Sequence, residues 1–392
     1  MIYIAWTIAI LYGLGLLSLC QNIWRTMQLV EEQPAFDMRP SAGDGQTPRI
    51  DVVIPVKDEE AHVASCIEAA LAQDYPDFQV IVVNDRSTDG TGRVVSAIAD
   101  REPRVKYVEI KELPAGLYGK PHAISQITSS LSGEIVFFMD SDLRVQPNCF
   151  RAIVRHLQAS KLDWLAVMGA PDLTMFWERL LVPLFGAVAY AWYDPRAISD
   201  PNSDVAIGSM FMVARRSSYH TIGGHEAVIR AYDEDSALLR LAKKAGQRVS
   251  YVLAPQLYTV RFYGNLKKTI LGMTRTCVGG IKTLPRMMIT LGAINFVALQ
   301  PVEILGGLGI ARACGVSVPW ATVWAGMAVV HFGLSALLCR LIYDRARTNR
   351  WLSLLHPLGA VLVLAVCLRA TRSMIRGGPI TWRGTTYEKP AT

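Results

Sequence analysis

The stretch FQVIVVNDRSTDGT, residues 78–91, decides the fold class of this chain. Its first half is an apolar, β-branched run, and its second half is rich in the Asn, Asp, Ser, Thr and Gly that favour turns and helix starts. A short buried strand followed at once by a helix start predicts one step of an α/β fold. The polar side chains then lie at the carboxyl end of that strand.

The same pattern repeats on both sides of this stretch. Further strands are predicted for DVVIPV (51–56), RVKYVEI (104–110) and EIVFFMD (134–140). Helical patterns separate them, at about 59–73, 90–100 and 121–131. Strands that alternate with helices predict right-handed crossovers and a mostly parallel, Rossmann-like sheet.

Composition places the rest of the chain near a membrane. Of the 392 residues, 51% are hydrophobic and only 19% charged, and the mean hydropathy is +0.25. The net charge of +7 comes without a run of basic residues interleaved with aromatics, so we expect no nucleic-acid partner and read the charge as that of a positive-inside membrane protein. The seven cysteines form no CxxC pair, so neither a zinc site nor a disulfide framework is expected.

Apolar segments lie at both ends of the chain. Residues 1–25 are long enough for an N-terminal transmembrane anchor, and the polar, Pro- and Gly-containing residues 26–48 read as a linker. Residues 49–285 are expected to form the folded domain. Spanning or interfacial helices are expected within 286–375, at about 288–311, 318–340 and 351–371, followed by a basic tail, 376–392. The basic loop at 343–350 favours a cytosolic location for that loop.

Inside the expected domain, residues 176–193 are unusually apolar (FWERLLVPLFGAVAYAWY). Two interpretations are equally favoured. One is a helix lying in the membrane surface, with its Trp and Tyr side chains at headgroup depth. The other is an ordinary core helix.

The clearest chemical feature is Asp140-Ser141-Asp142, directly after the apolar strand EIVFFM. Because side chains alternate along extended backbone, both carboxylates point to the same side and can converge on one hard cation with oxygen ligands. Asp85 ends the strand at 78–85, where a capped turn is at least as probable as a ligand contact.

A third acidic group, Asp233-Glu234-Asp235, opens the helical pattern SALLRLAKKAG. Acids in the first turn and lysines in the last favour the helix dipole, which is a complete structural explanation. The other two acidic groups would bind a substrate and a metal, and a reaction at such a site also requires a general base. This third group would supply that base.

Together these segments resemble the family 2 glycosyltransferases, which have an A-type nucleotide-sugar fold. The resemblance rests on five motifs in family order over about 200 residues: VVIPVKDEE (52–60), NDRSTDGT (84–91), GKPHA (119–123), DSD (140–142) and EDSALLRLAKKAG (234–246). The chain also resembles the polytopic branch of this family that is associated with hopanoid, carotenoid and ceramide-type glycolipids. This second resemblance rests on FWERLLVP (176–183), residues 208–224, residues 260–275 and the TWRGTTY tail.

The resemblance implies a role for each matching residue. The nucleoside of a UDP- or GDP-sugar would contact Pro55, Asp85 and either Asp58 or Glu59. Its diphosphate would lie near Lys120. Asp140 and Asp142 would bind Mg²⁺ or Mn²⁺, with Asp140 also facing the ribose, and Asp235 would be the catalytic base. Arg261 or Arg275 would steady the leaving diphosphate, or either marks the membrane boundary.

Two departures from the family pattern bear on this assignment. Asn84 stands where the family usually has Asp, and the Q-x-x-R-W motif of processive polysaccharide synthases is missing. The expected function is inverting, metal-dependent transfer of a sugar to a membrane lipid by a multi-pass inner-membrane protein with a cytosolic catalytic domain. The alternatives are a polysaccharide synthase of the same family and a non-catalytic membrane scaffold.

Overall fold

The computed structural model describes residues 12–22, 24, 25, 28, 36–39, 47–261, 265–376, 380–382 and 385–387. Contacts between residues divide the chain into two units. The α/β unit comprises Pro34–Asp172, Tyr193–Arg261 and Gly377–Thr392. The helical unit comprises Met1–Gln33, Leu173–Trp192 and Phe262–Arg376.

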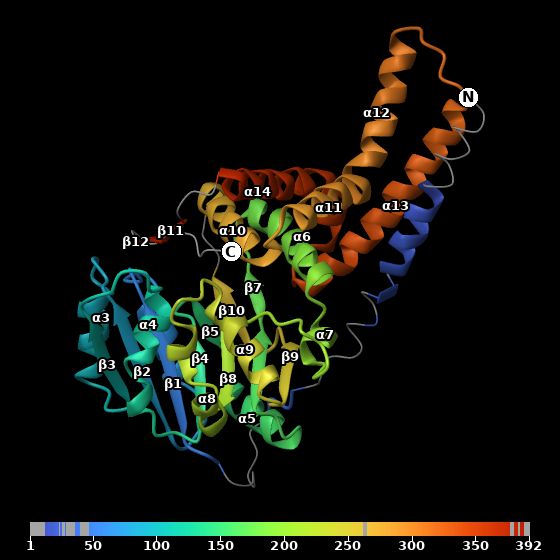
Figure 1. Ribbon diagram of the computed structural model, residues 1–392. Coiled ribbons are helices and arrows are strands. Elements are labelled where there is room, and N and C mark those ends of the chain that lie inside the picture. Colours follow the sequence, from blue (N-terminus) through green and yellow to red (C-terminus); the bar gives the residue numbers. More distant parts are fainter. Residues whose placement is uncertain are drawn as a thin grey trace. The chain divides into compact units, whose positions relative to one another are not determined.

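The α/β unit is built on a seven-stranded sheet with the order β3-β2-β1-β4-β8-β6-β9 (Figure 1). Its strands are β1 (Ile50–Val56), β2 (Phe78–Asp85), β3 (Val105–Ile110), β4 (Ile135–Met139), β6 (Trp164–Met168), β8 (Phe211–Arg215) and β9 (Val249–Leu253). Only β8 runs antiparallel to its neighbours, β4 and β6. The expectation of a mostly parallel α/β sheet is therefore confirmed.

The strands form where the sequence is apolar without interruption. All eight residues of β2 and all five of β4 are buried, because helices cover both faces of a parallel sheet. The helices of this unit are α2 (Val63–Leu71), α3 (Thr91–Ala99), α4 (Gly119–Ser125), α5 (Cys149–Ala159), α7 (Pro195–Ser199), α8 (Arg216–Thr221) and α9 (Glu234–Lys244), with 3₁₀ turns η1 (Thr128–Ser130) and η2 (Gly224–Val228). The helix expected at about 121–131 is thus shorter, and begins earlier, than the pattern suggested.

A second, three-stranded sheet has the order β5-β10-β7, and the sequence analysis did not anticipate it. Its strands are β5 (Leu143–Val145), β7 (Ala170–Asp172) and β10 (Tyr258–Arg261). β10 pairs with the strand that directly follows Asp140-Ser141-Asp142, with Val260 opposite Leu143. The pairing of β10 with β5 therefore holds the turn that carries Asp140 and Asp142 in place.

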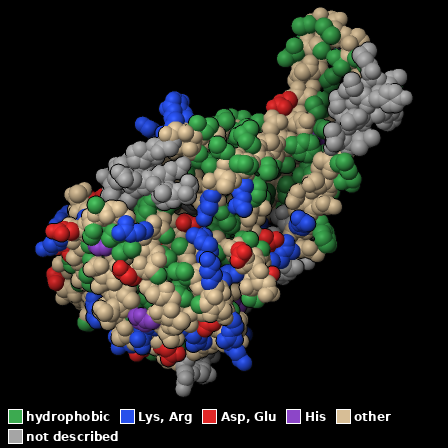
Figure 2. Space-filling model, viewed as in Figure 1, with side chains coloured by type: hydrophobic (Ala, Val, Ile, Leu, Met, Phe, Trp, Pro, Cys, Tyr) green, Lys and Arg blue, Asp and Glu red, His purple; other side chains and the backbone are tan. Residues whose placement is uncertain are grey.

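The helical unit holds the apolar C-terminal segments. Its elements are α6 (Phe176–Trp192), α10 (Leu266–Ile281), α11 (Leu284–Ile294), the π-helix η3 (Asn295–Leu299), α12 (Gln300–Ala313), α13 (Ala321–Arg345), η4 (Arg350–Leu355) and α14 (His356–Arg376). Within the described residues, three helical stretches are long and apolar enough to cross a membrane: Leu284–Ala313, Ala321–Arg345 and Arg350–Arg376. Figure 2 shows hydrophobic side chains gathered over this unit and charged side chains over the α/β unit. The expected apolar C-terminal helices are confirmed.

The ends of the chain are described only in part. The anchor expected over residues 1–25 falls partly outside the described residues, and residues 12–22 form a helix. Most of the linker expected over 26–48 also lies outside them. In the tail expected over 376–392, the described strands β11 (Ile380–Trp382) and β12 (Thr385–Tyr387) pair as an antiparallel ribbon.

The apolar segment around 176–192 forms α6 in the helical unit, although the sequence analysis set it inside the domain 49–285. Leu181 and Val182 are buried in an apolar cluster with Met273 of α10 and Val363 of α14. Trp192 donates a hydrogen bond from its indole Nε1 to Thr290 Oγ1, at 2.9 Å. Leu181, Val182 and Trp192 of α6 therefore contact other parts of the helical unit, as the residues of a core helix do.

The buried carboxylate of Asp51 gives a test of the fold. Asp51 is fully buried on β1 and accepts hydrogen bonds from the backbone N–H groups of Ser132 and Gly133 and from the Gln79 side chain. We expect Asp51→Ala to leave these donors unpaired and to cost about 3 kcal/mol or more. Thermal unfolding of the purified protein measures this loss of unfolding free energy. The exposed Asp74, which makes a 3.6 Å surface ion pair with Arg151, is the control, since Asp74→Ala should change little.

Candidate active site

The expected donor-binding residues lie where neighbouring parallel strands end at the same edge of the sheet. β1 lies between β2 and β4, so the loops after residues 56, 85 and 139 meet there. Pro55 is in β1, opposite Val83 of β2. Ligands of open α/β sheets bind at this carboxyl edge, and the site is built there.

The loops after β1 and β2 are locked together by hydrogen bonds. Asp58, which has a positive φ of 52°, accepts a hydrogen bond of 2.8 Å from the backbone N–H of Thr88. The Glu59 backbone N–H donates to Thr91 Oγ1 at 2.7 Å. Lys57 reaches across to the backbone carbonyls of Asp85 and Arg86. The two loops therefore form one preorganised wall of the site.

Asp85 is held in an ion pair with its neighbour. Its two carboxylate oxygens accept from the Arg86 Nε and Nη2 atoms, at 2.7 and 3.0 Å. The adjacent Asn84 donates to the Tyr107 hydroxyl and accepts from Ser87, so its amide shapes the turn. The Asn84 amide supplies both a hydrogen-bond donor and a hydrogen-bond acceptor. The carboxylate that is usual at this position in the family that the chain resembles would supply acceptors alone.

Lys120, at the start of α4, joins two of the carboxylate-bearing segments. Its ammonium lies 2.9 Å from Asp140 Oδ1 and 2.9 Å from Glu234 Oε1, and 3.5 Å from Asp235 Oδ1. Residues separated by as many as 115 positions thus meet at one nitrogen. The sequence analysis gave roles to Lys120, Asp140 and Asp235 but none to Glu234, which it named only as part of the acidic helix start.

One ammonium against three carboxylates leaves this cluster short of positive charge. Burial lowers the pKa of Lys120, but Asp140, Asp235 and Glu234 outweigh it and hold that pKa well above its usual value. Burial and then Glu234 raise the pKa of the Asp235 carboxyl well above its usual range, and Lys120 offsets this only partly. The Asp235 side chain still keeps 30% of its surface accessible, so a substrate can reach it.

Asp142 is fixed through its backbone. Its carbonyl accepts a 3.1 Å hydrogen bond from the N–H of Arg261 on β10. The Arg261 side chain pairs with Asp172 of β7, at 3.1 Å. Arg261 therefore lies beside the aspartate turn, whereas Arg275 belongs to α10 of the helical unit, and its expected contact with a diphosphate stays a prediction.

The donor set at the aspartate turn fits a hard divalent cation. Asp140 and Asp142 offer carboxylate oxygens, which Mg²⁺ and Mn²⁺ prefer, and the surplus negative charge around Lys120 favours a further cation. Among the described residues no group of three or more His, Cys, Asp or Glu side chains is arranged to hold a metal by itself.

Two residues to which the sequence analysis gave no role hold Asp235 in place. A Cβ added to Gly208 would overlap the Asp235 Cβ, and the Gly208 N–H donates to Ser236 Oγ at 3.0 Å. Only a glycine lets the chain before β8 approach α9 this closely. The quoted segment 208–224 begins at this glycine, but no pattern within it indicates which residue the glycine faces.

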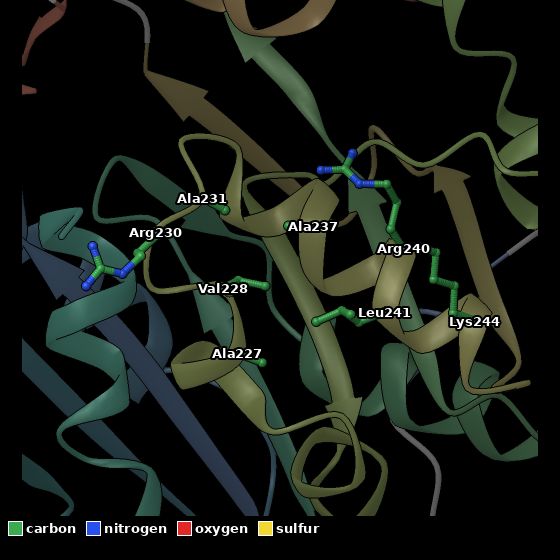
Figure 3. A pocket seen from close by; sticks show the side chains of 8 residues that line it. All are labelled: Ala227, Val228, Arg230, Ala231, Ala237, Arg240, Leu241 and Lys244. Atoms are coloured by element: carbon green, nitrogen blue, oxygen red, sulfur yellow. The ribbon is translucent and has the colours of Figure 1, made fainter. Parts of the chain in front are cut away.

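A shallow pocket of about 340 Å³ lies beside the same helix (Figure 3). Its floor is made by small and apolar side chains, and Arg230, Arg240 and Lys244 stand at its margins with their charged ends well apart. Arg240 pairs with Asp233, the residue before Glu234, at 3.1 Å. This ion pair ties the second turn of α9 to the residue that precedes the acidic pair.

Comparison with known proteins agrees with this architecture. The family model described as Glycosyl transferase family 2 matches residues 51–222. The chain is 32% identical over 115 residues to Glycosyltransferase GlyA of Streptococcus pneumoniae, covering 29% of this chain and 16% of that protein. It is 27% identical over 144 residues to the Beta-monoglucosyldiacylglycerol synthase of a Synechocystis species, covering 35% and 30%. The chain thus spans less than a third of the length of either relative.

A solved structure shares the fold over most of both chains. It is the mannosyltransferase PcManGT from Pyrobaculum calidifontis in complex with GDP-Man and Mn²⁺, with a TM-score of 0.53 and 19% identity. The similarity covers 93% of this chain and 98% of that one. The A-type fold expected from the sequence is confirmed.

The close approach at Gly208 yields a prediction about catalysis. We expect Gly208→Ala to push Asp235 away from Lys120 and to lower turnover by at least about tenfold, equal to 1.4 kcal/mol or more. Donor affinity should change much less, because the loops after β1 and β2 do not involve this glycine. Steady-state kinetics and donor titration separate the two effects. Gly186→Ala on α6, where an added Cβ meets nothing within 4 Å, is the matched control.

Proposed function

Because residues 51–222 form a glycosyl transferase family 2 domain, we propose that this chain transfers a sugar from a nucleotide-sugar donor to a membrane lipid, with inversion at the anomeric carbon. The observation that carries the proposal is the meeting of Asp140, Glu234 and Asp235 at Lys120, on the carboxyl edge of the sheet. It supplies a cation for a leaving diphosphate and a carboxylate for an attacking hydroxyl in one place.

The donor is held by the loops after β1 and β2 and by Lys120. The nucleoside binds at the wall lined by Pro55, Asp58, Glu59 and Asp85. Lys120 pairs with the diphosphate. A UDP- or GDP-sugar fits this arrangement, and the fold relative from Pyrobaculum calidifontis was solved with GDP-Man. Asp140 and Asp142 would hold Mg²⁺ or Mn²⁺, which when bound neutralises charge on the diphosphate.

Binding of the donor also prepares the base. In the structure Lys120 is shared among Asp140, Glu234 and Asp235, and a diphosphate would compete with these carboxylates for its ammonium. Once Lys120 turns toward phosphate, the ionised Asp235 side chain is free to face the acceptor hydroxyl. Asp235 then takes the proton of the acceptor hydroxyl as that oxygen attacks the anomeric carbon. One displacement inverts the configuration.

A lipid acceptor is favoured by the helical unit. Three of its helices are long and apolar enough to cross a membrane, and many of their large side chains are exposed, Ile310 and Val329 among them. Such surface is stable only against hydrocarbon or another protein. Relatives named Beta-monoglucosyldiacylglycerol synthase support a glycerolipid or a similar hydroxyl-bearing lipid as the acceptor. The basic loop at 343–350 supports a multi-pass inner-membrane protein with cytosolic chemistry.

Replacing the base tests the mechanism directly. We expect Asp235→Asn to keep donor binding but to lower transfer by at least about 10²-fold, because an amide cannot accept the proton. Lipid-dependent release of nucleoside diphosphate by the purified protein measures transfer, and titration with the nucleotide sugar measures binding. Asp204→Asn, an exposed change outside the cluster, should behave as the unchanged protein does. Normal turnover by Asp235→Asn would disprove the assignment.

Chelation tests the role given to the aspartate turn. We expect EDTA to abolish transfer and added Mn²⁺ or Mg²⁺ to restore it, since a diphosphate leaves slowly unless its charge is neutralised. Asp142→Ala should raise the concentration of metal that restores half of the activity, while Asp74→Ala should not. Full transfer in EDTA would remove the metal-binding role from Asp142 and Asp140.

A further inference from the structure

A second pocket, of about 380 Å³, lies within the helical unit between α12, α13 and the helix at residues 12–22. Figure 1 shows residues 12–22 running beside α13. Its walls are mostly apolar, from Ile304, Leu308, Val318 and Trp324. Three polar side chains also line it: Tyr12, Gln300 and Glu303.

Two of these polar groups are acceptors with capacity to spare. The buried Gln300 Oε1 has no hydrogen-bond partner among the described residues. Glu303 accepts one hydrogen bond, from Asn295 Nδ2 at 2.8 Å, although a carboxylate can accept several. Both lie within the candidate span Leu284–Ala313, where Glu303 is exposed. An ionisable residue within a membrane-spanning segment usually marks a functional site.

The third polar group is held in place by a buried histidine. The Tyr12 hydroxyl and His331 Nδ1 lie 2.7 Å apart, and His331 is fully buried. The rings of Phe296 and Trp324 pack edge-on against Tyr12, at 6.0 and 6.3 Å between centroids. These contacts fix the tyrosine at the pocket instead of leaving it to face hydrocarbon.

The backbone next to the pocket is also specialised. The π-helix Asn295–Leu299 directly precedes Gln300, and Ser335 Oγ on α13 donates to the Val297 carbonyl. A π-helical turn inserts one extra residue and is common at functional sites. Its first residue, Asn295, reaches Glu303, eight residues further along the helix.

We propose that this pocket binds a lipid whose polar end carries hydroxyl groups. The spare acceptors require a ligand that donates hydrogen bonds, and the apolar walls suit its hydrocarbon part. The described lining residues include no basic side chain that would pair with a phosphate headgroup. For its ligand class the proposal rests on the lipid acceptor proposed above, but the site is separate from the carboxylate cluster and binding does not require transfer.

Photolabelling of the full-length protein in nanodiscs tests the proposal. The probes are diacylglycerol and phosphatidylcholine bearing the same diazirine on one acyl chain, since only the first has a free hydroxyl. We expect diacylglycerol to label peptides from residues 300–324 and an excess of unlabelled diacylglycerol, but not phosphatidylcholine, to compete. Equal labelling and equal competition by the two lipids would overturn the proposal.

Two glycines on α12 supply a matched pair of variants. Gly307 lines the pocket and Gly309 does not, and an added Cβ meets nothing within 4 Å at either position. Gly307→Leu should fill the pocket and reduce diacylglycerol labelling about tenfold, while Gly309→Leu, which improves helix propensity equally, should leave it unchanged. Gln300→Leu should remove the preference for diacylglycerol over phosphatidylcholine.

The outcomes separate this site from the proposed function. Retained labelling in Gly307→Leu, with both variants folded by thermal unfolding, would overturn the pocket assignment even if transfer is normal. Loss of labelling in Gly307→Leu alone would support the site even if no transfer is detected with any donor. Donor-dependent release of nucleoside diphosphate, measured on the same preparations, reports on the proposed function independently.

Discussion

The ion pairs of Lys120 are the interaction on which the active-site geometry depends. Three carboxylates would repel one another at the start of α9 and the end of β4 unless a cation lay among them. Lys120 supplies that cation from α4, at 2.9 Å from both Asp140 and Glu234. A single ammonium does not balance the cluster, and the pKa of Asp235 stays raised. The fold therefore stabilises an arrangement that a further cation and an anionic substrate would complete.

The rest of the α/β unit can be understood as support for this cluster. Parallel strands bring the loops after β1, β2 and β4 to one edge, and Asp51 secures the opposite end of β1 to the chain that enters β4. Pairing of β10 with β5 fixes the turn that carries Asp142. Gly208 then allows α9 to come close enough for Asp235 to reach Lys120. Each of these supports lies outside the cluster, so the cluster's own side chains are left for chemistry.

The sequence predicted those parts that leave a local pattern. Buried parallel strands are continuous apolar runs, so β1, β2 and β4 could be assigned, and the polar residues at their carboxyl ends identified Asp85, Asp140 and Asp142. β5, β7 and β10 were missed because three or four residues carry no detectable period. Gly208 and Glu234 were missed for another reason: their roles depend on contacts between residues distant in sequence. The segment 176–192 remained undecided because composition alone does not distinguish hydrocarbon from a protein neighbour.

The two regions that we propose to bind ligands share one physical property, although their surroundings differ. Around Lys120 the carboxylates outnumber the cation, and beside Gln300 the acceptors outnumber the donors that the described residues provide. Folded proteins ordinarily pair their buried polar groups, because each one left unsatisfied costs stability. An imbalance of one sign therefore indicates the complementary ligand: a cation at the first site, and a hydrogen-bond donor at the second. On this reasoning both proposals call for a lipid that bears a hydroxyl group, which would donate a hydrogen bond at Gln300 in one case and lose its proton to Asp235 in the other.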